Sequence, residues 1–136
     1  MKKRGQISIE YLIVVGFVTF IVIAVLGVSY FYASSIRDQI KSSQISSFAE
    51  KIIVEAEKVY YAGEPSKSTI SVYLPAGINS ITIEEQNMII SYQSSSGTTI
   101  SAFKSNVPIE ITTTITEGPK RLSITAQSSV VSIIQT

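Results

Sequence analysis

Residues 11–32 read YLIVVGFVTFIVIAVLGVSYFY, and this stretch determines what kind of fold the chain can adopt. It lies within a run of 26 residues, 11–36, that contains no charged side chain. A bilayer core needs about 20 apolar residues in a helix, so this run is long enough to cross a membrane. A secretory signal has an apolar region of roughly 7–15 residues and a small-residue cleavage site, and neither feature is present here. We therefore expect the segment to remain in the mature protein.

The charges on either side of the run predict its orientation. Lys2, Lys3 and Arg4 precede the run, whereas the charges that follow it are mixed, beginning with Arg37 and Asp38. The positive-inside rule places the N-terminus in the cytoplasm and the rest of the chain outside the cell. On this basis alone, the chain is a monomeric, membrane-anchored protein with an extracellular domain.

The composition excludes several classes of function. The chain has 136 residues and no cysteine, histidine or tryptophan, which excludes disulfides, Cys/His metal sites and Ser-His-Asp catalysis. Eleven basic residues against ten acidic ones give a net charge of +1, without the basic excess of a nucleic-acid binder. Phosphate-binding glycine motifs are also missing. We expect a protein that is not an enzyme and has no cofactor, no metal and no nucleic-acid partner.

The helix is predicted to continue beyond the apolar run as an amphipathic half, residues 36–62. Its apolar positions recur at spacings of three, four and one, which is typical of one helical stripe. These positions are Ile36, Ile40, Ile45, Phe48, Ala49, Ile52, Ile53, Ala56, Val59 and Tyr60. The serine-rich residues 42–47 leave open whether the helix bends there, since serine is a middling helix former. Gly63 and Pro65 are expected to end the helix.

Residues 63–136 are expected to form a β-rich globular domain. From Ser68 onward apolar residues alternate with polar ones in six or seven short segments separated by turns. Residues 109–115 give the clearest such segment, which Gly118 and Pro119 are expected to close. The predicted fold class is therefore α+β, with a long N-terminal helix packed on a C-terminal antiparallel β-sheet or small sandwich. One face of the sheet would bury the amphipathic half of the helix.

Glu10 does not fit a simple membrane anchor. It stands at the mouth of the apolar run, where a carboxylate is costly unless it is paired, which makes it a candidate functional residue. Alternatively, Glu10 lies at the membrane interface, near the positive end of the helix dipole. Gly5 offers a small, flexible site between the basic residues and the helix, which a protease can enter.

Residues 3–12, KRGQISIEYL, resemble the class III signal peptide of archaeal type IV pilins. The shared pattern is a short basic leader, a glycine, then Gln-x-Ser-x-Glu and an apolar helix. The resemblance implies that residues 1–5 are a leader, with charges Lys2, Lys3 and Arg4, and that a prepilin peptidase cuts between Gly5 and Gln6. Residues 6–35 would then form the apolar helix, which lies in the membrane of the precursor and in the core of the filament.

Cleavage would leave a free α-amino group on Gln6, and a buried cation needs a partner. Glu10 lies about 6 Å further along the helix axis, so a stagger of that size would pair Glu10 of one subunit with Gln6 of another. Pairing within one chain is an alternative. We expect the helix core to be packed through a further set of residues: Ile7, Leu12, Gly16, Phe17, Phe20 and Gly27.

The resemblance implies a structural subunit of an extracellular type IV pilus-like filament that serves surface adhesion. Its partners would be other copies of itself, a prepilin peptidase, an assembly ATPase, a membrane platform protein and, before assembly, membrane lipid. The precursor is expected in the cell membrane and the assembled form on the cell surface. Two alternatives remain open, namely the monomeric membrane-anchored β-domain and a minor pilin that initiates or caps a filament.

Overall fold

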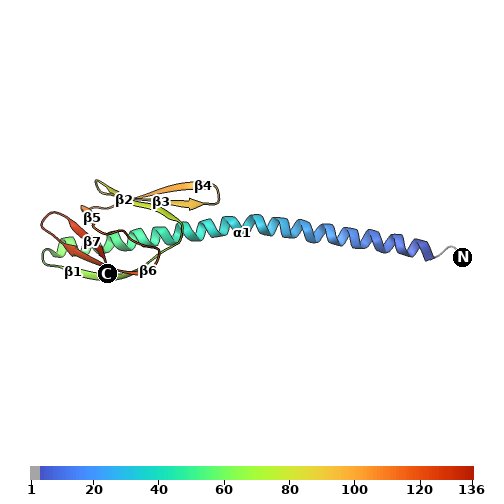
Figure 1. Ribbon diagram of the computed structural model, residues 1–136, viewed down its shortest axis with the longest axis horizontal. Coiled ribbons are helices and arrows are strands. Elements are labelled where there is room, and N and C mark those ends of the chain that lie inside the picture. The colour runs from blue at the N-terminus through green and yellow to red at the C-terminus, as the bar shows by residue number, and fades with distance from the viewer. Residues whose placement is uncertain (1–3) are drawn as a thin grey trace. The chain divides into compact units, whose positions relative to one another are not determined.

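A computed structural model describes the backbone of residues 4–136 and the side chains of residues 9–136. The chain forms two compact units, Met1–Arg37 and Asp38–Thr136. The described residues contain one helix and seven strands, which are drawn in Figure 1. These elements are α1 (Arg4–Ala62), β1 (Lys67–Leu74), β2 (Ile78–Glu84), β3 (Asn87–Ser94), β4 (Gly97–Lys104), β5 (Ile109–Ile111), β6 (Gly118–Ala126) and β7 (Val131–Gln135). The predicted α+β fold class is confirmed.

Helix α1 contains 59 residues, and residues 42–47 are helical throughout. The helix therefore continues through the serine-rich stretch whose conformation the sequence left open. It ends at Ala62, where the N–H of Gly63 donates to the carbonyl of Tyr60 at 3.1 Å. Gly63 has a φ of +79°, a left-handed conformation that favours glycine at the end of a helix. The predicted helix end is confirmed.

The strands of the second unit form two sheets. One has the order β1-β6-β7-β5 and the other the order β2-β3-β4. The pairings are antiparallel except for β5 with β7, which run parallel. The four-stranded sheet is thus mixed, and the predicted antiparallel arrangement holds for the three-stranded sheet and for β1-β6-β7.

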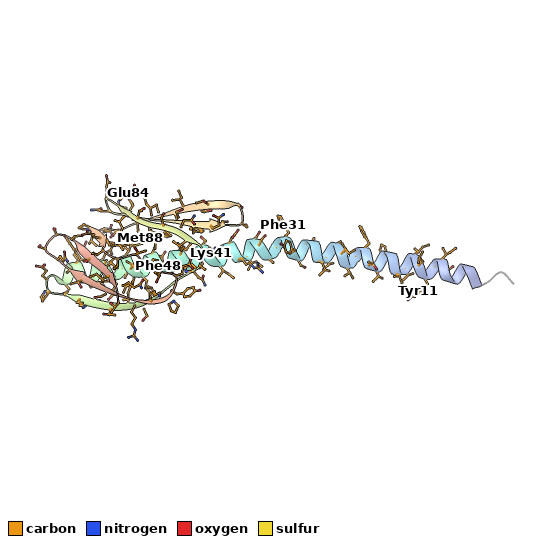
Figure 2. The ribbon with its side chains drawn as sticks, in the orientation of Figure 1. Tyr11, Phe31, Lys41, Phe48, Glu84 and Met88 are labelled. Carbon is orange, nitrogen blue, oxygen red and sulfur yellow. The ribbon has the colours of Figure 1, made fainter. Side chains whose placement is uncertain are left out.

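The second half of α1 packs against these strands (Figure 1), and Figure 2 shows Phe48 near Met88 of β3. Buried side chains recur along the helix from Ile45 to Val59, in the predicted stripe. They are Ile45, Phe48, Ala49, Ile52, Ile53, Ala56 and Val59. They meet Met88, Ile90 and Tyr92 of β3, with Leu122, Ile124 and Ile133 of β6 and β7, in one core cluster.

Two members of the predicted stripe are not part of this core. Ile36 and Ile40 are each 53% exposed, so the packed part of the stripe begins only at Ile45. The spacing of apolar residues identified the correct helix face, but it does not indicate how far along the helix the sheets extend.

The segment that looked like the clearest strand is mostly not a strand. β5 ends at Ile111, and residues 112–117 leave the sheet. In residues 112–117, hydrogen bonds between a backbone group and a side chain take the place of backbone ladder bonds. Thr113 Oγ1 accepts from the N–H of Gln135 at 3.0 Å, and the N–H of Thr116 donates to Gln135 Oε1 at 3.0 Å. Gly118 begins β6 rather than closing the preceding strand.

Candidate membrane-spanning and assembly segment

The predicted cleavage site, Gly5 and Gln6, lies at the beginning of α1. Lys2 and Lys3 lie outside the described residues, as do the side chains of Arg4, Gln6 and Ile7. The helix begins at Arg4, so the bond between Gly5 and Gln6 lies within its first turn.

Residues 9–32 expose an apolar surface around the helix. Every large apolar side chain in this stretch is between 43% exposed, at Val15, and 84% exposed, at Tyr30. Figure 2 shows Tyr11 and Phe31 projecting from the helix. Soluble monomers rarely expose apolar patches of more than a few hundred Å², so a surface of this kind is typical of an interaction site and is compatible with anchoring in a membrane. α1 is long and apolar enough to cross a membrane.

Two hydroxyl groups, one in this stretch and one just after it, form hydrogen bonds within the helix itself. Thr19 Oγ1 donates to the carbonyl of Val15 and Ser34 Oγ donates to the carbonyl of Phe31, each at 2.8 Å. A hydroxyl that is bonded to its own helix avoids the cost of being buried without a partner. These two side chains can therefore enter an apolar environment without water.

Four of the predicted helix-core residues share one face of the helix. At 3.6 residues per turn, Leu12, Phe20 and Gly27 lie within about 40° of Gly16 around the axis. A Cβ atom built at Gly16 or Gly27 has no atom within 4 Å, so both glycines leave an open notch. Phe17 lies about 100° away from this face and Ile7 about 180° away. The six residues therefore do not form a single stripe.

Glu10 is exposed and lies about 120° around the axis from Gly16. It is the sole acidic residue of the sequence before Asp38. The glycine notch and the carboxylate therefore face different directions, so a bundle of such helices has separate positions for close packing and for charge pairing.

A second polar constellation, which the sequence did not indicate, lies in the second unit. The carboxylate of Asp38 accepts from Ser94 Oγ at 3.0 Å, from the N–H of Ser95 at 3.2 Å and also from Ser95 Oγ. Lys41 Nζ donates to the carbonyl of Gln93 at 2.9 Å. These bonds tie the helix to the β3–β4 turn, and we call this set the helix–turn latch. The hydrogen bond from the Ser95 hydroxyl is the main cause that lowers the pKa of Asp38 below its usual range.

Further polar contacts join the helix to other parts of the domain. Glu55 accepts from Ser68 Oγ at 2.7 Å and from Lys58 Nζ at 3.1 Å, and the serine bond is the main cause that lowers the pKa of Glu55. Glu57 accepts from the side-chain amide of Asn106 at 2.8 Å. Through Ser68 and Asn106, these two carboxylates fix the β-rich domain on the helix.

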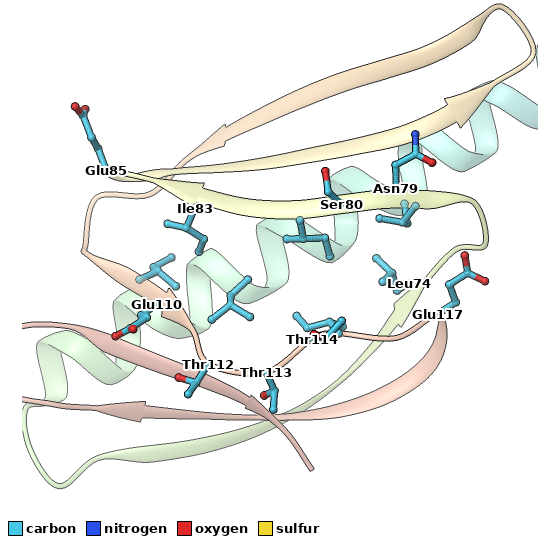
Figure 3. A pocket seen from close by; sticks show the side chains of 15 residues that line it. Leu74, Asn79, Ser80, Ile83, Glu85, Glu110, Thr112, Thr113, Thr114 and Glu117 are labelled. Atoms are coloured by element: carbon cyan, nitrogen blue, oxygen red, sulfur yellow. The ribbon is translucent and has the colours of Figure 1, made fainter.

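An open groove of about 620 Å³ lies between β2 and residues 109–117, and Figure 3 shows it from close by. Isoleucines line the groove, and Ile83 points into it, whereas Glu85 points away. Glu117 at the rim accepts from the N–H of Gly77 at 2.7 Å. In the part of the chain that the structure describes, no three His, Cys, Asp or Glu side chains are close enough to hold a metal ion. The lining of the groove thus combines isoleucines with asparagine, serine, threonine and glutamate side chains.

No protein-family model, curated protein or solved structure matches the chain. The resemblance to archaeal pilins therefore rests on residues 3–12 and on the helix that follows them.

Proposed function

We propose that the chain is a structural subunit of an extracellular type IV pilus-like filament and that it has no catalytic role. One observation carries the proposal: the exposed apolar surface of residues 9–32 lies on the same helix whose second half forms the core of the β-rich domain. A subunit of this kind holds a folded domain outside while its apolar helix associates with lipid or with other helices. The Gly5–Gln6 junction and Glu10 stand in the positions that the family resemblance requires.

In the proposed mechanism the precursor waits in the membrane with its N-terminus in the cytoplasm. A prepilin peptidase cuts between Gly5 and Gln6, and an assembly ATPase with a membrane platform protein moves the subunit into the growing fibre. The apolar helix then exchanges lipid for neighbouring helices. Gly16 and Gly27 allow close approach there, because small residues let helix backbones pack tightly. The β-rich domains form the outside of the fibre and serve adhesion.

The proposal gives Glu10 a role in selecting the register of neighbouring helices. Apolar helices can slide past one another at little cost, whereas a buried charge without a partner is strongly destabilising. Pairing of Glu10 with the α-amino group of a neighbouring Gln6 would favour one stagger, of about 6 Å along the axis. We expect Glu10→Ala to be cleaved normally but to give few filaments, and Ser29→Ala, outside the Gln-x-Ser-x-Glu pattern, to serve as the matched control. A wild-type filament yield from Glu10→Ala would refute the pairing.

The decisive test is the N-terminal residue of the protein in a sheared extracellular fraction, measured by mass spectrometry. A chain that begins at Gln6 and is recovered in a high-mass filament fraction is the expected result. A chain that keeps Met1 or Lys2 and is found only in membranes would overturn the proposal. The remaining interpretation would then be a monomeric membrane-anchored β-domain.

A further inference from the structure

The three-stranded sheet has two free edges of ordinary strand length. β2 and β4 flank β3, and they contain seven and eight residues. Within the described residues, the backbones of both strands hydrogen-bond only in their ladders with β3. Neither strand contains proline. An exposed edge of this length is a template for pairing with another chain.

The two edges carry opposite charges at the same end of the sheet. Glu84 of β2 lies opposite Asn87 of β3, which lies opposite Lys104 of β4. Glu84 and Lys104 are both exposed. β2 and β4 are parallel to each other, because both are antiparallel to β3. A second copy placed beside the first in the same orientation therefore brings Lys104 on one edge to Glu84 on the other.

We propose that β4 of one copy pairs in parallel with β2 of the next copy, with Lys104 beside Glu84 across the contact. The occupant of each free edge is thus a second copy of this chain. The inference rests on the proposed filament function and deepens it, since it names a contact between the outer domains. An open groove lies beside β2, and residues 109–117 form its other wall (Figure 3).

Charge favours this pairing over the parallel alternatives. Opposite charges on neighbouring strands stabilise a sheet, whereas like charges directly opposite each other destabilise it. A parallel pair of two β4 strands in register would place Lys104 against Lys104, and a pair of two β2 strands would place Glu84 against Glu84. The β4–β2 contact is heterologous, and such contacts repeat along an open polymer when the rotation does not close a ring. The contact also covers part of Ile100, which is 67% exposed on β4.

Disulfide trapping tests the contact in the full chain, because the protein has no native cysteine. Within one copy Glu84 and Lys104 are two strand spacings apart, or about 9.5 Å, which is beyond the reach of a disulfide. Between paired copies they are about one spacing apart, or about 4.8 Å. We expect filaments of the double variant Glu84→Cys/Lys104→Cys to give a ladder of covalent oligomers on a non-reducing gel.

Matched variants test whether the ladder of covalent oligomers depends on the register that places Lys104 beside Glu84. Each single cysteine variant should give dimers at most, and Ser80→Cys/Lys104→Cys, displaced by four residues along β2, should give no ladder. Glu84→Lys and Lys104→Glu should each reduce filament yield several-fold, and the exchange of both charges in one chain should restore it. Maleimide labelling of the unfolded chain shows that both thiols are present and reduced.

Failure of this contact can be distinguished from failure of the proposed function. Filaments that begin at Gln6, form no ladder with two reactive thiols and tolerate both single charge reversals would overturn the contact and leave the filament function standing. A wild-type chain that keeps its leader and forms no filaments overturns both.

Discussion

Removing the Phe48 side chain should test whether the second half of α1 forms part of the domain core. The change leaves the exposed apolar surface of residues 9–32 unaltered. Phe48 is 2% exposed and packs in the cluster that joins α1 to both sheets. Truncation of a buried phenylalanine to alanine costs about 3–5 kcal/mol, because burial is lost and a cavity remains. Small domains are stable by only about 5–15 kcal/mol, so Phe48→Ala removes a large share of this free energy of unfolding.

This loss converts into a large shift of the melting temperature. For a domain of the size of Asp38–Thr136, each kcal/mol shifts Tm by roughly 4–8 °C, so Phe48→Ala should lower Tm by at least about 12 °C. Val54→Ala on the same helix is the matched control, since Val54 is 49% exposed. A substitution at such a surface position usually changes stability by less than about 0.5 kcal/mol, or under about 4 °C.

Near-UV circular dichroism of the full chain in detergent micelles is a suitable assay. The chain has no tryptophan, and Tyr92 is 5% exposed, so the tyrosine signal reports the packing of the domain. The far-UV signal would also contain the helix of residues 4–37, which detergent holds folded. Equal and small Tm shifts for Phe48→Ala and Val54→Ala would refute the conclusion that this half of α1 forms the core.

Three further outcomes follow from the structure. Asp38→Asn should destabilise the domain at pH 7, and the difference from wild type should disappear in thermal unfolding as the pH falls below the usual aspartate pKa of about 3.9. The pKa of Asp38 is lowered in the folded state, so ionised Asp38 stabilises the fold at pH values above its pKa in the unfolded chain. This stabilisation is lost as the pH falls through the pKa of Asp38 in the folded state. A stability difference between variant and wild type that stays constant with pH would contradict this role of Asp38. Gly77→Ala should lower stability by about 1–2 kcal/mol, since Gly77 has a φ of +84° and a Cβ there would lie 3.0 Å from Lys41 Nζ; Ala76→Ser, at the exposed neighbouring position, is its control. Gly5→Val should leave the precursor uncut in the membrane, which an unchanged N-terminus in mass spectrometry would show, whereas release of a chain beginning at Gln6 would contradict the predicted cleavage site.

The helix and its buried face could be predicted from the sequence because they depend on local spacing. The seven strands could be predicted for the same reason, since apolar and polar residues alternate along them. The early end of β5 could not be predicted, because it depends on Gln135, which lies about 20 positions later in the chain. The N–H of Gln135 donates to the Thr113 hydroxyl, and the side chain of Gln135 accepts from the N–H of Thr116. Alternation of apolar and polar residues shows that a segment can form a strand. It does not show whether a neighbouring strand supplies the backbone hydrogen bonds that the segment needs.

The helix–turn latch was missed for a similar reason. Asp38 and Ser94 are 56 positions apart, and the sequence around each residue gives no sign that the two form a hydrogen bond. The opposite charges of Glu84 and Lys104 also became informative only once the strand register placed them on one row. By contrast, Gly5, Gln6 and Glu10 form a compact sequence motif, and the structure adds to it the exposure of the apolar helix that follows.

The serine-rich residues 42–47 show how packing overrides local preference. Four serines at about 0.5 kcal/mol each relative to alanine weaken the helix by about 2 kcal/mol. Burial of Ile45 and Phe48, which are 0% and 2% exposed, contributes about 1.5–3 kcal/mol for each side chain. The gain from packing exceeds the local cost, and it is available only if the helix continues and keeps both side chains on the buried face. A sequence analysis that counts propensity alone therefore predicts a weak point, whereas the folded domain requires a helix there.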